Sequence, residues 1–420
     1  MLNNLWQECQ SPLPKVRLEK STTTDVVVVG AGFSGLSTAY HLALQGKSVV
    51  VLEAQEIGYG ASGRNVGLAN AGLWIMPSET QKILGKKQGQ ALNQLLIDAP
   101  LYVRELITKH ALDCDFSDNG TLHLAHSKSA IKYLQERKKQ LSAYGAKIEF
   151  LDSQSTFSKT CAQGYHGALL DIQAGTVQPL KYCHALAKLA VDNGVQIFTQ
   201  SAVINIDKQA NNFVLNTANG QVIANKVVLA TNAYEEKLNN NKPLYTPLYY
   251  SQLASEPLSL EQQKNCLPDN NGCWDSGAVM RSFRTDRDHR LIIGTIGNIH
   301  TKDASGFKRW AKHVAQRTFT SVGELNYPYA WSGRIAKSHN NIPQVLEVDK
   351  GVVQIMGYSG RGIAGATVIG RELAAYLSDT SVQPLALPVN KAKNISFNRV
   401  RTAVYEIGSQ LSHLSDHIVR

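Results

Sequence analysis

The sequence predicts an α/β protein in which a discontinuous, Rossmann-type nucleotide domain holds an inserted β-rich domain. Three observations support this fold class. Residues 25–53 have the pattern of a buried strand, a glycine turn, a helix and a second strand. Signals of the same kind recur near 195–235 and 330–375, and short strands separated by turns fill the sequence between these blocks. With 420 residues, the chain is long enough for two domains.

The first block carries a dinucleotide-binding motif. Residues 25–29 are an almost continuous run of valines, and Gly30, Gly32 and Gly35 follow in the G-x-G-x-x-G order. These glycines permit a tight turn, close approach of the backbone to a pyrophosphate, and close packing of the helix on the strand. Glu53 ends the second strand, where a carboxylate accepts both ribose hydroxyls and disfavours the 2′-phosphate of NADP. The predicted cofactor contacts of this block are Gly30, Ala31, Gly32, Phe33, Ser34, Gly35, Glu53 and Ala54.

Two later glycine-rich segments fit the same ligand. Gly60–Gly67 is a loop of small residues against which a flat ring system can lie. Within it, Arg64 offers a partner for phosphate, and Asn65 offers both a donor and an acceptor. The glycines of residues 357–362 precede a helix, whose dipole and free N–H groups favour negative charge. A plain strand–turn–helix connection is the alternative interpretation of 357–362.

Composition excludes several classes of function. The formal net charge is +10, but no dense basic run with interleaved aromatic residues is present, so no nucleic-acid partner is expected. The charge fits an anionic substrate, an anionic membrane face or simple solubility. The six cysteines are scattered and are expected to be reduced thiols, and no metal site is predicted. The first residues contain no apolar signal core and no apolar stretch is long enough to span a bilayer, which favours a cytoplasmic enzyme.

The pattern along the chain predicts the remaining elements. Helices are expected over 78–112, 128–145, 306–322, 363–377 and 398–418, and strands over 120–127, 226–234 and 351–360, with a hairpin turn at Asn219–Gly220. The nucleotide-binding domain is expected to comprise residues 1–80, 171–235 and 326–380. The substrate domain is expected to comprise 81–170 and 236–325, followed by a C-terminal segment, 381–420. The active site is expected in the cleft where the two domains meet.

Three separated segments are similar to a known family: EAQEIGYGASGRNVGLANAG (53–72), KVVLATNAY (226–234), and YAWSGRIAKSHNNIP with VVQIMGYSGRGIAGATVIGRELA (329–343 and 352–374). They resemble the D-amino-acid oxidase superfamily of flavoenzymes, and are most similar to its gamma-glutamylputrescine oxidase branch. Val66 and Arg361 depart from that branch, which often has glycine and histidine there. The resemblance implies a glutathione-reductase-type domain that binds FAD. The further FAD contacts it implies are Gly60, Ala61, Ser62, Gly63, Arg64, Asn65, Val66, Gly67, Val203, Thr231, Asn232, Gly333, Gly357, Gly360, Arg361, Gly362 and Ile363.

The resemblance also implies the chemistry, which is oxidative deamination of a small amine or amino acid and a place in polyamine catabolism. The neutral amine gives a hydride to flavin N5, and the resulting imine is hydrolysed to a carbonyl and ammonia or a smaller amine. This route requires neither a protein nucleophile nor a metal. We expect Arg281 or Arg284 to bind a substrate carboxylate, unless they are solvated strand charges. The residues expected to shape the substrate site are Tyr249, Tyr250, Arg281, Arg284, Trp331 and Tyr358.

Two departures bear on the cofactor and the electron acceptor. Sarcosine oxidase relatives attach the flavin through a cysteine near the segment that matches 329–340, and this segment contains no cysteine. They also place a lysine over the flavin, and the segment where it is expected, 289–297, contains no lysine. FAD is therefore expected to bind non-covalently, with oxygen or a quinone as acceptor. A D-amino-acid or proline-type dehydrogenase that reduces a membrane quinone is the alternative, with peripheral membrane contact through 398–420. Alternatively, residues 398–420 pack against the rest of the protein. A third possibility for the function is a binding or assembly protein that keeps the flavin fold without catalysing a reaction.

Overall fold

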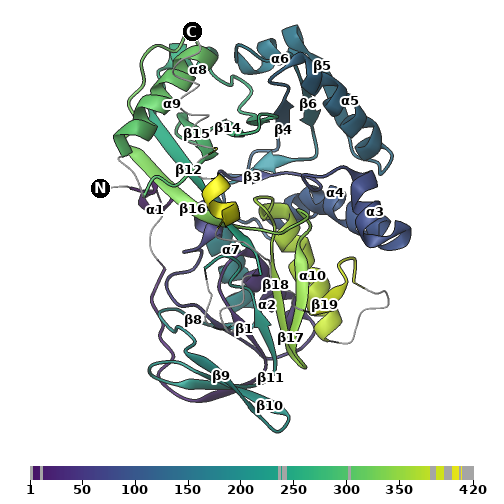
Figure 1. Cartoon of the computed structure of the whole chain (residues 1–420). Coiled ribbons are helices and arrows are strands. Elements are labelled where there is room, and N and C mark those ends of the chain that lie inside the picture. Colours follow the sequence, from purple (N-terminus) through teal and green to yellow (C-terminus); the bar gives the residue numbers. More distant parts are fainter. Residues whose placement is uncertain are drawn as a thin grey trace.

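The structure is a computed structural model that describes residues 3–9, 13–234, 238, 244–300, 304–378, 385–391, 400–405 and 408. It contains a nine-stranded sheet, an eight-stranded sheet and a two-stranded ribbon. Figure 1 shows the nine-stranded sheet in the lower half of the molecule and the eight-stranded sheet in the upper half.

The helices of the described chain are α1 (Leu5–Glu8), α2 (Phe33–Leu44), α3 (Pro77–Leu84), α4 (Lys86–Lys109), α5 (Lys128–Ser142), α6 (Ser153–Thr160), α7 (Pro179–Asp192), α8 (Leu260–Lys264), α9 (Ala304–Thr318) and α10 (Ile363–Leu377), with the 3₁₀ helix η1 (Ala61–Gly63). The strands of the nine-stranded sheet are β1 (Thr22–Val29), β2 (Val49–Leu52), β8 (Gln196–Phe198), β9 (Asn205–Gln209), β10 (Asn212–Asn216), β11 (Gln221–Leu229), β17 (Gln344–Asp349), β18 (Val352–Met356) and β19 (Val389–Lys391). The strands of the eight-stranded sheet are β4 (Thr121–Leu124), β5 (Ile148–Asp152), β6 (Gly167–Asp171), β12 (Thr246–Pro257), β13 (Gly272–Asp275), β14 (Arg281–Thr285), β15 (Arg290–Ile296) and β16 (Tyr329–Lys337). The ribbon pairs β3 (Leu68–Ala69) with β7 (Gly175–Thr176).

The centre of the nine-stranded sheet is parallel and runs in the order β18-β11-β1-β2-β8. Strand β1 pairs with β2 and with β11 over its apolar half, Val26–Val29, so these valines are buried on both faces of the sheet. The carboxyl ends of β1, β2, β11 and β18 therefore meet along one edge. This arrangement confirms the predicted α/β fold with a Rossmann-type core.

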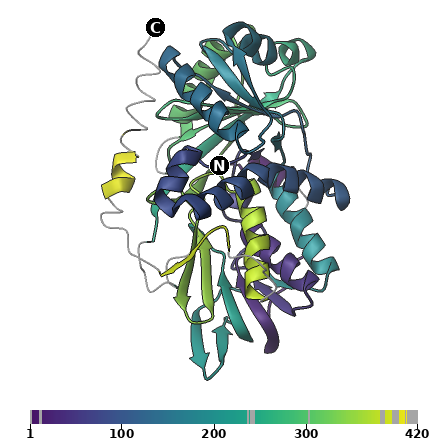
Figure 2. The ribbon, with the colours of Figure 1, turned by 90° about the vertical axis from the view of Figure 1, so that its right-hand side faces the viewer.

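Helices cover one face of this sheet, and Figure 2 shows α2, α7 and α10 side by side there, with α4 crossing above α10. The core between helices and sheet contains Val28, Leu36, Leu186 and Leu373. The opposite face of the sheet carries a second apolar cluster, in which Val27 and Leu52 pack with Phe213 and Leu215 of the β9–β10–β11 region. We call this face the hairpin side.

The α2 helix buries a histidine whose titration links stability to pH. His41 Nδ1 donates to the Ser37 carbonyl (2.7 Å), so Nε2 accepts from the Tyr102 hydroxyl (2.5 Å), and both bonds suit the neutral ring. Burial lowers the pKa of His41 from 6.5 to about 4. Between these values the unfolded chain binds the proton and the folded chain does not. The free energy of unfolding should therefore fall as the pH falls from 6.5 to 4, by at most about 3 kcal/mol.

Urea unfolding between pH 4 and pH 7 measures this linkage. The His41→Leu variant should show a shallower slope than the wild type, while His123 and His184, whose pKa values burial also lowers, keep their share of the slope. His300→Gln, at an exposed position, should keep the wild-type slope. An unchanged slope in His41→Leu would assign the acid sensitivity to other groups.

The eight-stranded sheet presents two chemically different faces. One face packs against α9 and holds Leu253, Phe283 and Ile293 together with Trp310. Residues alternate along each strand, so the neighbours of these core residues lie on the opposite face. That face is directed at the nucleotide-binding half, as the hydrogen bond from Gln252 Nε2 to the Arg64 carbonyl shows (2.9 Å).

The structure revises some of the elements predicted from the sequence. The single helix expected over 78–112 is wrong, because Gly85 (φ 82°) ends α3 and begins α4. The hairpin at Asn219–Gly220 is confirmed and joins β10 to β11. The helix expected over 398–418 falls largely outside the described residues, of which 400–405 are helical. The domain bounds stay a prediction, although the eight-stranded sheet draws its strands from two separate stretches, 121–171 and 246–337.

Within the described residues, no helix combines the length and apolar character needed to cross a membrane.

Candidate cofactor and substrate site

The dinucleotide turn joins β1 to α2 at the edge where the parallel strands end. Gly30 has a φ of 106°, and its N–H donates to the Leu52 carbonyl (2.8 Å). A Cβ atom on Gly35 would lie 2.0 Å from the Gly30 carbonyl oxygen, so only glycine lets α2 pack this close to the strand end. Gly32 is the N-cap of α2, which leaves the first N–H groups of the helix at the turn.

The Glu53 carboxylate lies beside this turn, at the end of β2. Its Oε2 accepts from the Ala31 N–H (2.8 Å) and its Oε1 from the Gln55 N–H (2.9 Å). Burial raises the pKa of the Glu53 carboxyl, while these backbone donors act in the opposite direction. Ala54 directly follows it. An acceptor is thus held next to the first glycines, as ribose recognition requires.

The Gly60–Gly67 loop packs directly on the first turn of α2. Ser62 Oγ accepts from the Phe33 N–H (3.0 Å). Asn65 organises the loop internally, because its Nδ2 donates to the Ala61 and Ser62 carbonyls and its Oδ1 accepts from the Gly67 N–H. The Arg64 guanidinium lies 4.3 Å from the centre of the Tyr59 ring.

The third glycine turn follows β18 and reaches the same edge. Gly357 has a φ of 82°, and its N–H donates to Asn232 Oδ1 (3.1 Å), which links this turn to the end of β11. The hydroxyl of buried Tyr358 lies 2.8 Å from Ser34 Oγ on α2. Thr231 Oγ1 is buried and has no hydrogen-bond partner among the described residues. Gly360, with a φ of 94°, and Gly362, the N-cap of α10, lead into Ile363.

Arg361 is a buried cation at the boundary between the two sheets. Its Cζ lies 4.5 Å from the Trp74 ring centre and 4.6 Å from the Trp274 ring centre. Nη1 donates to the Ala71 carbonyl (2.7 Å), whereas Nε and Nη2 are buried without a partner in the part of the chain that the structure describes. Burial lowers the pKa of Arg361. The two unpartnered donors share one edge of the guanidinium, which suits an acceptor from a ligand.

The eight-stranded sheet adds an aromatic wall beside Arg361. His123 of β4 stacks on Trp274 of β13, with 3.4 Å between ring centres, and its Nδ1 has no partner among the described residues. Burial lowers the pKa of His123, and the Arg137 and Arg361 charges lower it further. Sequence reasoning missed His123, Trp74 and Trp274. The available signal was the TLHL pattern of β4, which places His123 opposite the core leucines.

The substrate candidates fall into different environments. Tyr250 is buried, donates to Ser282 Oγ (2.9 Å), and lies against Gly294, where an added Cβ would be 2.5 Å from its ring. Tyr249 is half-buried and lies opposite Arg334 in the antiparallel pairing of β12 with β16. The backbone N–H of Arg281 donates to Asp275 Oδ1 (3.1 Å). Burial raises the pKa of the Asp275 carboxyl, whereas this hydrogen bond and the charge of Arg281 act in the opposite direction.

Arg284 and Trp331 both donate hydrogen bonds to backbone carbonyls, and Arg284 also lines a second pocket together with Asn270 and Asp286. Arg284 Nη1 donates to the Val177 carbonyl (2.7 Å) and to two carbonyls of the Gly60–Gly67 loop, while Nε donates to the Thr285 carbonyl (3.1 Å). Trp331 Nε1 donates to the Arg64 carbonyl (3.0 Å). Together with Tyr358, these residues hold the glycine-rich segments in place. The carboxylate-binding role of Arg284 stays a prediction, although its Nε and Nη1 atoms already donate to backbone carbonyls.

Two predicted cofactor residues lie at the margins of the site. Gly333 of β16 faces the Arg64 side chain, with 3.1 Å between an added Cβ and the Arg64 Cβ. Val203 is partly buried against the apolar cluster on the hairpin side of the nine-stranded sheet. The predicted residues thus extend from the hairpin side of the sheet to the eight-stranded sheet.

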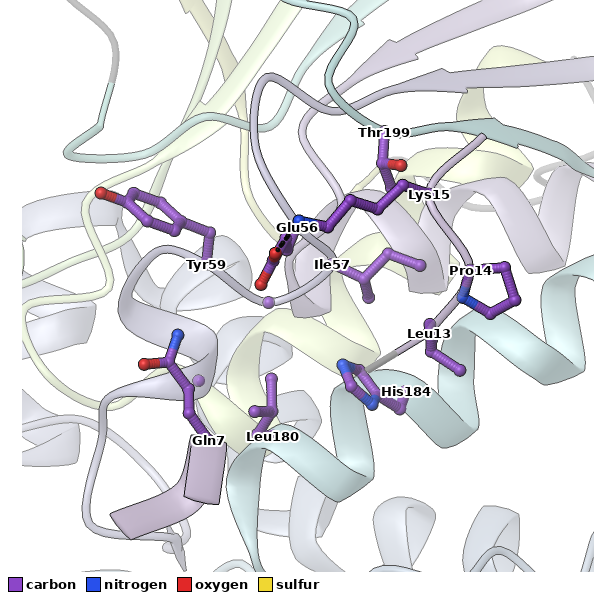
Figure 3. Close-up of a pocket in the computed structure, with 12 residues that line it drawn as sticks. Gln7, Leu13, Pro14, Lys15, Glu56, Ile57, Tyr59, Leu180, His184 and Thr199 are labelled. Carbon is purple, nitrogen blue, oxygen red and sulfur yellow. Dashed lines mark ion pairs between the residues drawn. The ribbon is translucent and has the colours of Figure 1, made fainter. Parts of the chain in front are cut away.

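Figure 3 shows a pocket beside the dinucleotide turn, between the lead-in residues Leu13–Lys15, α7 and the segment after β2. Lys15 and Glu56 form an ion pair across it (2.9 Å). Of the predicted cofactor residues, Gly63 alone lines this pocket, so it adjoins the glycine turns without being formed by them. Across the described residues, no group of three or more His, Cys, Asp and Glu side chains is arranged to hold a metal ion.

Comparisons with known proteins agree with this geometry. A family model described as "FAD dependent oxidoreductase" (DAO) matches residues 25–376. The gamma-glutamylputrescine oxidoreductase of Escherichia coli is 29% identical over 409 residues, covering 94% of this chain and 95% of the relative. A probable oxidoreductase, OrdL, of Haemophilus influenzae is 30% identical over 385 residues, covering 89% and 86%. The solved glycine oxidase of Geobacillus kaustophilus superposes with a TM-score of 0.73 at 19% identity, covering 89% of this chain and all of that one.

Proposed function

Because the chain belongs to the DAO family of FAD-dependent oxidoreductases, we propose that it oxidises a primary or secondary amine and that its substrate is a gamma-glutamylated polyamine or a related amine. The E. coli relative, which is similar over nearly the full length of both chains, carries this proposal. The reaction would convert the amine to an imine, which water hydrolyses to a carbonyl and ammonia or a smaller amine. A cytoplasmic location belongs to the same proposal.

The residues at the sheet edge fit FAD. Gly30 and Gly35 let the turn pack against the Ala230 and Gly30 carbonyls, which an added Cβ would meet, and this packing brings the N-terminus of α2 to the sheet edge where a pyrophosphate would bind. Buried Thr231 Oγ1 and the Nε and Nη2 atoms of Arg361 lack partners among the described residues, and FAD offers phosphate, hydroxyl and carbonyl groups to satisfy them. We therefore propose that these residues hold it, together with Glu53. When bound, FAD supplies the two-electron oxidation by accepting a hydride.

The chain's own residues favour the neutral form of a bound amine. Only the free amine has the electron pair that supports loss of a hydride from the adjacent carbon. Burial is the main cause of the lowered pKa of His123, and the positive charges of Arg137 and Arg361 lower it further, so we propose that these charges create a positive field at the wall. The same field would lower the pKa of an ammonium group bound beside it. Trp74 and Trp274 pack against Arg361, and the low polarity of their rings would strengthen the effect of its charge on a bound amine.

An anaerobic substrate panel tests the proposal. Gamma-glutamylputrescine, putrescine, D- and L-amino acids and proline are mixed separately with the holoenzyme, and the absorbance of the oxidised flavin is followed. Bleaching by the glutamylated amine and by no free amino acid is expected. Bleaching by D-amino acids or proline alone would replace the proposed substrate class, and no bleaching by any amine would contradict amine oxidation.

The electron acceptor is proposed separately. β15 carries no lysine, in contrast to the oxygen-activating position expected from sarcosine oxidase relatives. A quinone acceptor is therefore the second candidate beside oxygen. Hydrogen peroxide release in air, compared with reduction of a soluble quinone, distinguishes an oxidase from a dehydrogenase.

Glu53 provides a test of cofactor placement. Glu53→Gln is expected to weaken FAD binding about tenfold, because an amide has one acceptor where the carboxylate serves both backbone N–H groups and the ribose. Titration of apoprotein with FAD, followed by flavin fluorescence, measures the dissociation constant. Glu56→Gln, three residues on and partly exposed, should bind FAD as the wild type does. Equal affinity in both variants would place the ribose elsewhere.

A further inference from the structure

Five consecutive carbonyl groups of the Gly60–Gly67 loop accept hydrogen bonds from side chains outside the loop. We call the donor set the carbonyl clamp. It consists of Asn4 Nδ2 to the Gly63 oxygen (3.1 Å), Gln252 Nε2 and Trp331 Nε1 to the Arg64 oxygen (2.9 and 3.0 Å), Trp6 Nε1 to the Asn65 oxygen (2.9 Å), and Arg284 Nη1 to the Val66 and Gly67 oxygens (3.2 and 3.4 Å).

The clamp residues are fixed by contacts with one another. Trp6 is 1% exposed, and its ring meets the edge of Trp331 at 5.7 Å between centres and lies 5.8 Å from the Arg284 guanidinium. Asn4 Oδ1 accepts from the Trp6 N–H (3.1 Å), which caps α1. The Asn3 carbonyl accepts from the Ala330 N–H of β16 (3.1 Å). The N-terminal segment is therefore built into the eight-stranded sheet, and its donors have little freedom to relax.

The clamp determines where the loop N–H groups point. In a trans peptide, the carbonyl of one residue and the N–H of the next lie on opposite sides of the chain, and the described chain contains no cis peptide. Because the Arg64 and Asn65 oxygens face the clamp, the N–H groups of Asn65 and Val66 face away from it. Neither N–H makes a hydrogen bond anywhere in the described structure, whereas those of Arg64 and Gly67 do.

We propose that the carbonyl clamp aims the Asn65 and Val66 N–H groups at an acceptor atom of the isoalloxazine ring, and that Asn4 and Trp6 are positioning residues for this contact. Two adjacent, preorganised donors stabilise negative charge, so they bind the reduced, electron-rich ring more strongly than the oxidised ring. The inference depends on FAD binding, which family membership supplies, and not on the proposed substrate.

Two conservative substitutions test the proposal. Asn4→Asp keeps the oxygen that caps α1 but replaces the donor to Gly63 with an acceptor, and Trp6→Phe keeps an aromatic ring but removes the donor to Asn65. We expect FAD affinity to fall about five- to tenfold in each variant. We also expect a more negative reduction potential and a shifted visible spectrum of the bound flavin. Glu8→Gln, on the exposed face of α1, is the matched control and should match the wild type.

Affinity is measured on the apoprotein and the potential on the holoenzyme, by equilibration with a reference dye. A purely structural role would lower the melting temperature and leave the potential and spectrum of bound flavin unchanged, and that result would overturn the proposal. If Asn4→Asp does not fold, Trp331→Phe provides the second variant with the same expected outcome. Failure of every amine in the substrate panel would leave these flavin measurements intact, so the two proposals fail separately.

Discussion

Replacing Gly35 with alanine is expected to give a protein that is purified without bound FAD and is about 3 kcal/mol less stable than the wild type. The added Cβ would lie 2.0 Å from the Gly30 oxygen and 3.2 Å from the Val28 side chain. Neither the backbone of the glycine turn nor the core valine can move without shifting α2 away from β1. That shift would withdraw the helix N-terminus from the pyrophosphate, so affinity should fall by at least about a hundredfold.

Gly306→Ala is the matched control for this substitution. Gly306 also lies in a helix, α9, but its added Cβ would meet no atom within 4 Å. Alanine there should leave FAD content unchanged and raise stability by about 0.5–1 kcal/mol. Visible absorbance per protein and urea unfolding measure both effects. Retention of bound flavin by Gly35→Ala would mean that the turn does not contact the pyrophosphate.

Replacing Arg361 with methionine is expected to preserve the fold, to weaken FAD binding about tenfold, and to lower the rate of flavin reduction in the FAD-saturated protein by roughly two to three orders of magnitude. Methionine fills the space between Trp74 and Trp274 and removes a charge whose burial is costly, so the protein should remain folded. The loss arises because Nε and Nη2 no longer face the site and because the positive field on a bound amine is removed.

Stopped-flow reduction at several pH values distinguishes these causes. Without Arg361, a bound amine should remain protonated to higher pH, so the rise of the reduction rate with pH should shift upward. Arg371→Met, further along α10 and partly exposed, is the control and should reduce at the wild-type rate. A rate for Arg361→Met within about threefold of the wild type would remove Arg361 from the site.

Local patterns were sufficient to predict the nucleotide-binding core. The valine runs of β1 and β2 predict buried parallel strands, and the glycine spacing between them predicts the turn and the close helix packing. Both signals are local, so they can be identified in the sequence alone. The break between α3 and α4 was missed, because one glycine in a long helical pattern is often tolerated, and here its positive φ is what separates the helices.

The clamp and the aromatic wall could not be predicted in the same way. Asn4 and Trp6 meet the loop from 59 residues away, and Arg284 meets Val66 across 218. The sequence displays the charge of Arg284, which predicts binding of a substrate carboxylate, but not the carbonyl oxygens to which its Nη1 donates. Burial and long-range partners decide such roles, and they appear only in the folded chain.

The parallel pairing of β4 with β13 has a consequence for biosynthesis. A ribosome releases residues 121–124 long before residues 272–275, so the nascent chain carries β4 with one open edge until the later strand emerges. Such an edge invites pairing with another unfinished copy. Production of this enzyme should therefore depend on chaperone capacity, and fragments that stop before β13 should aggregate.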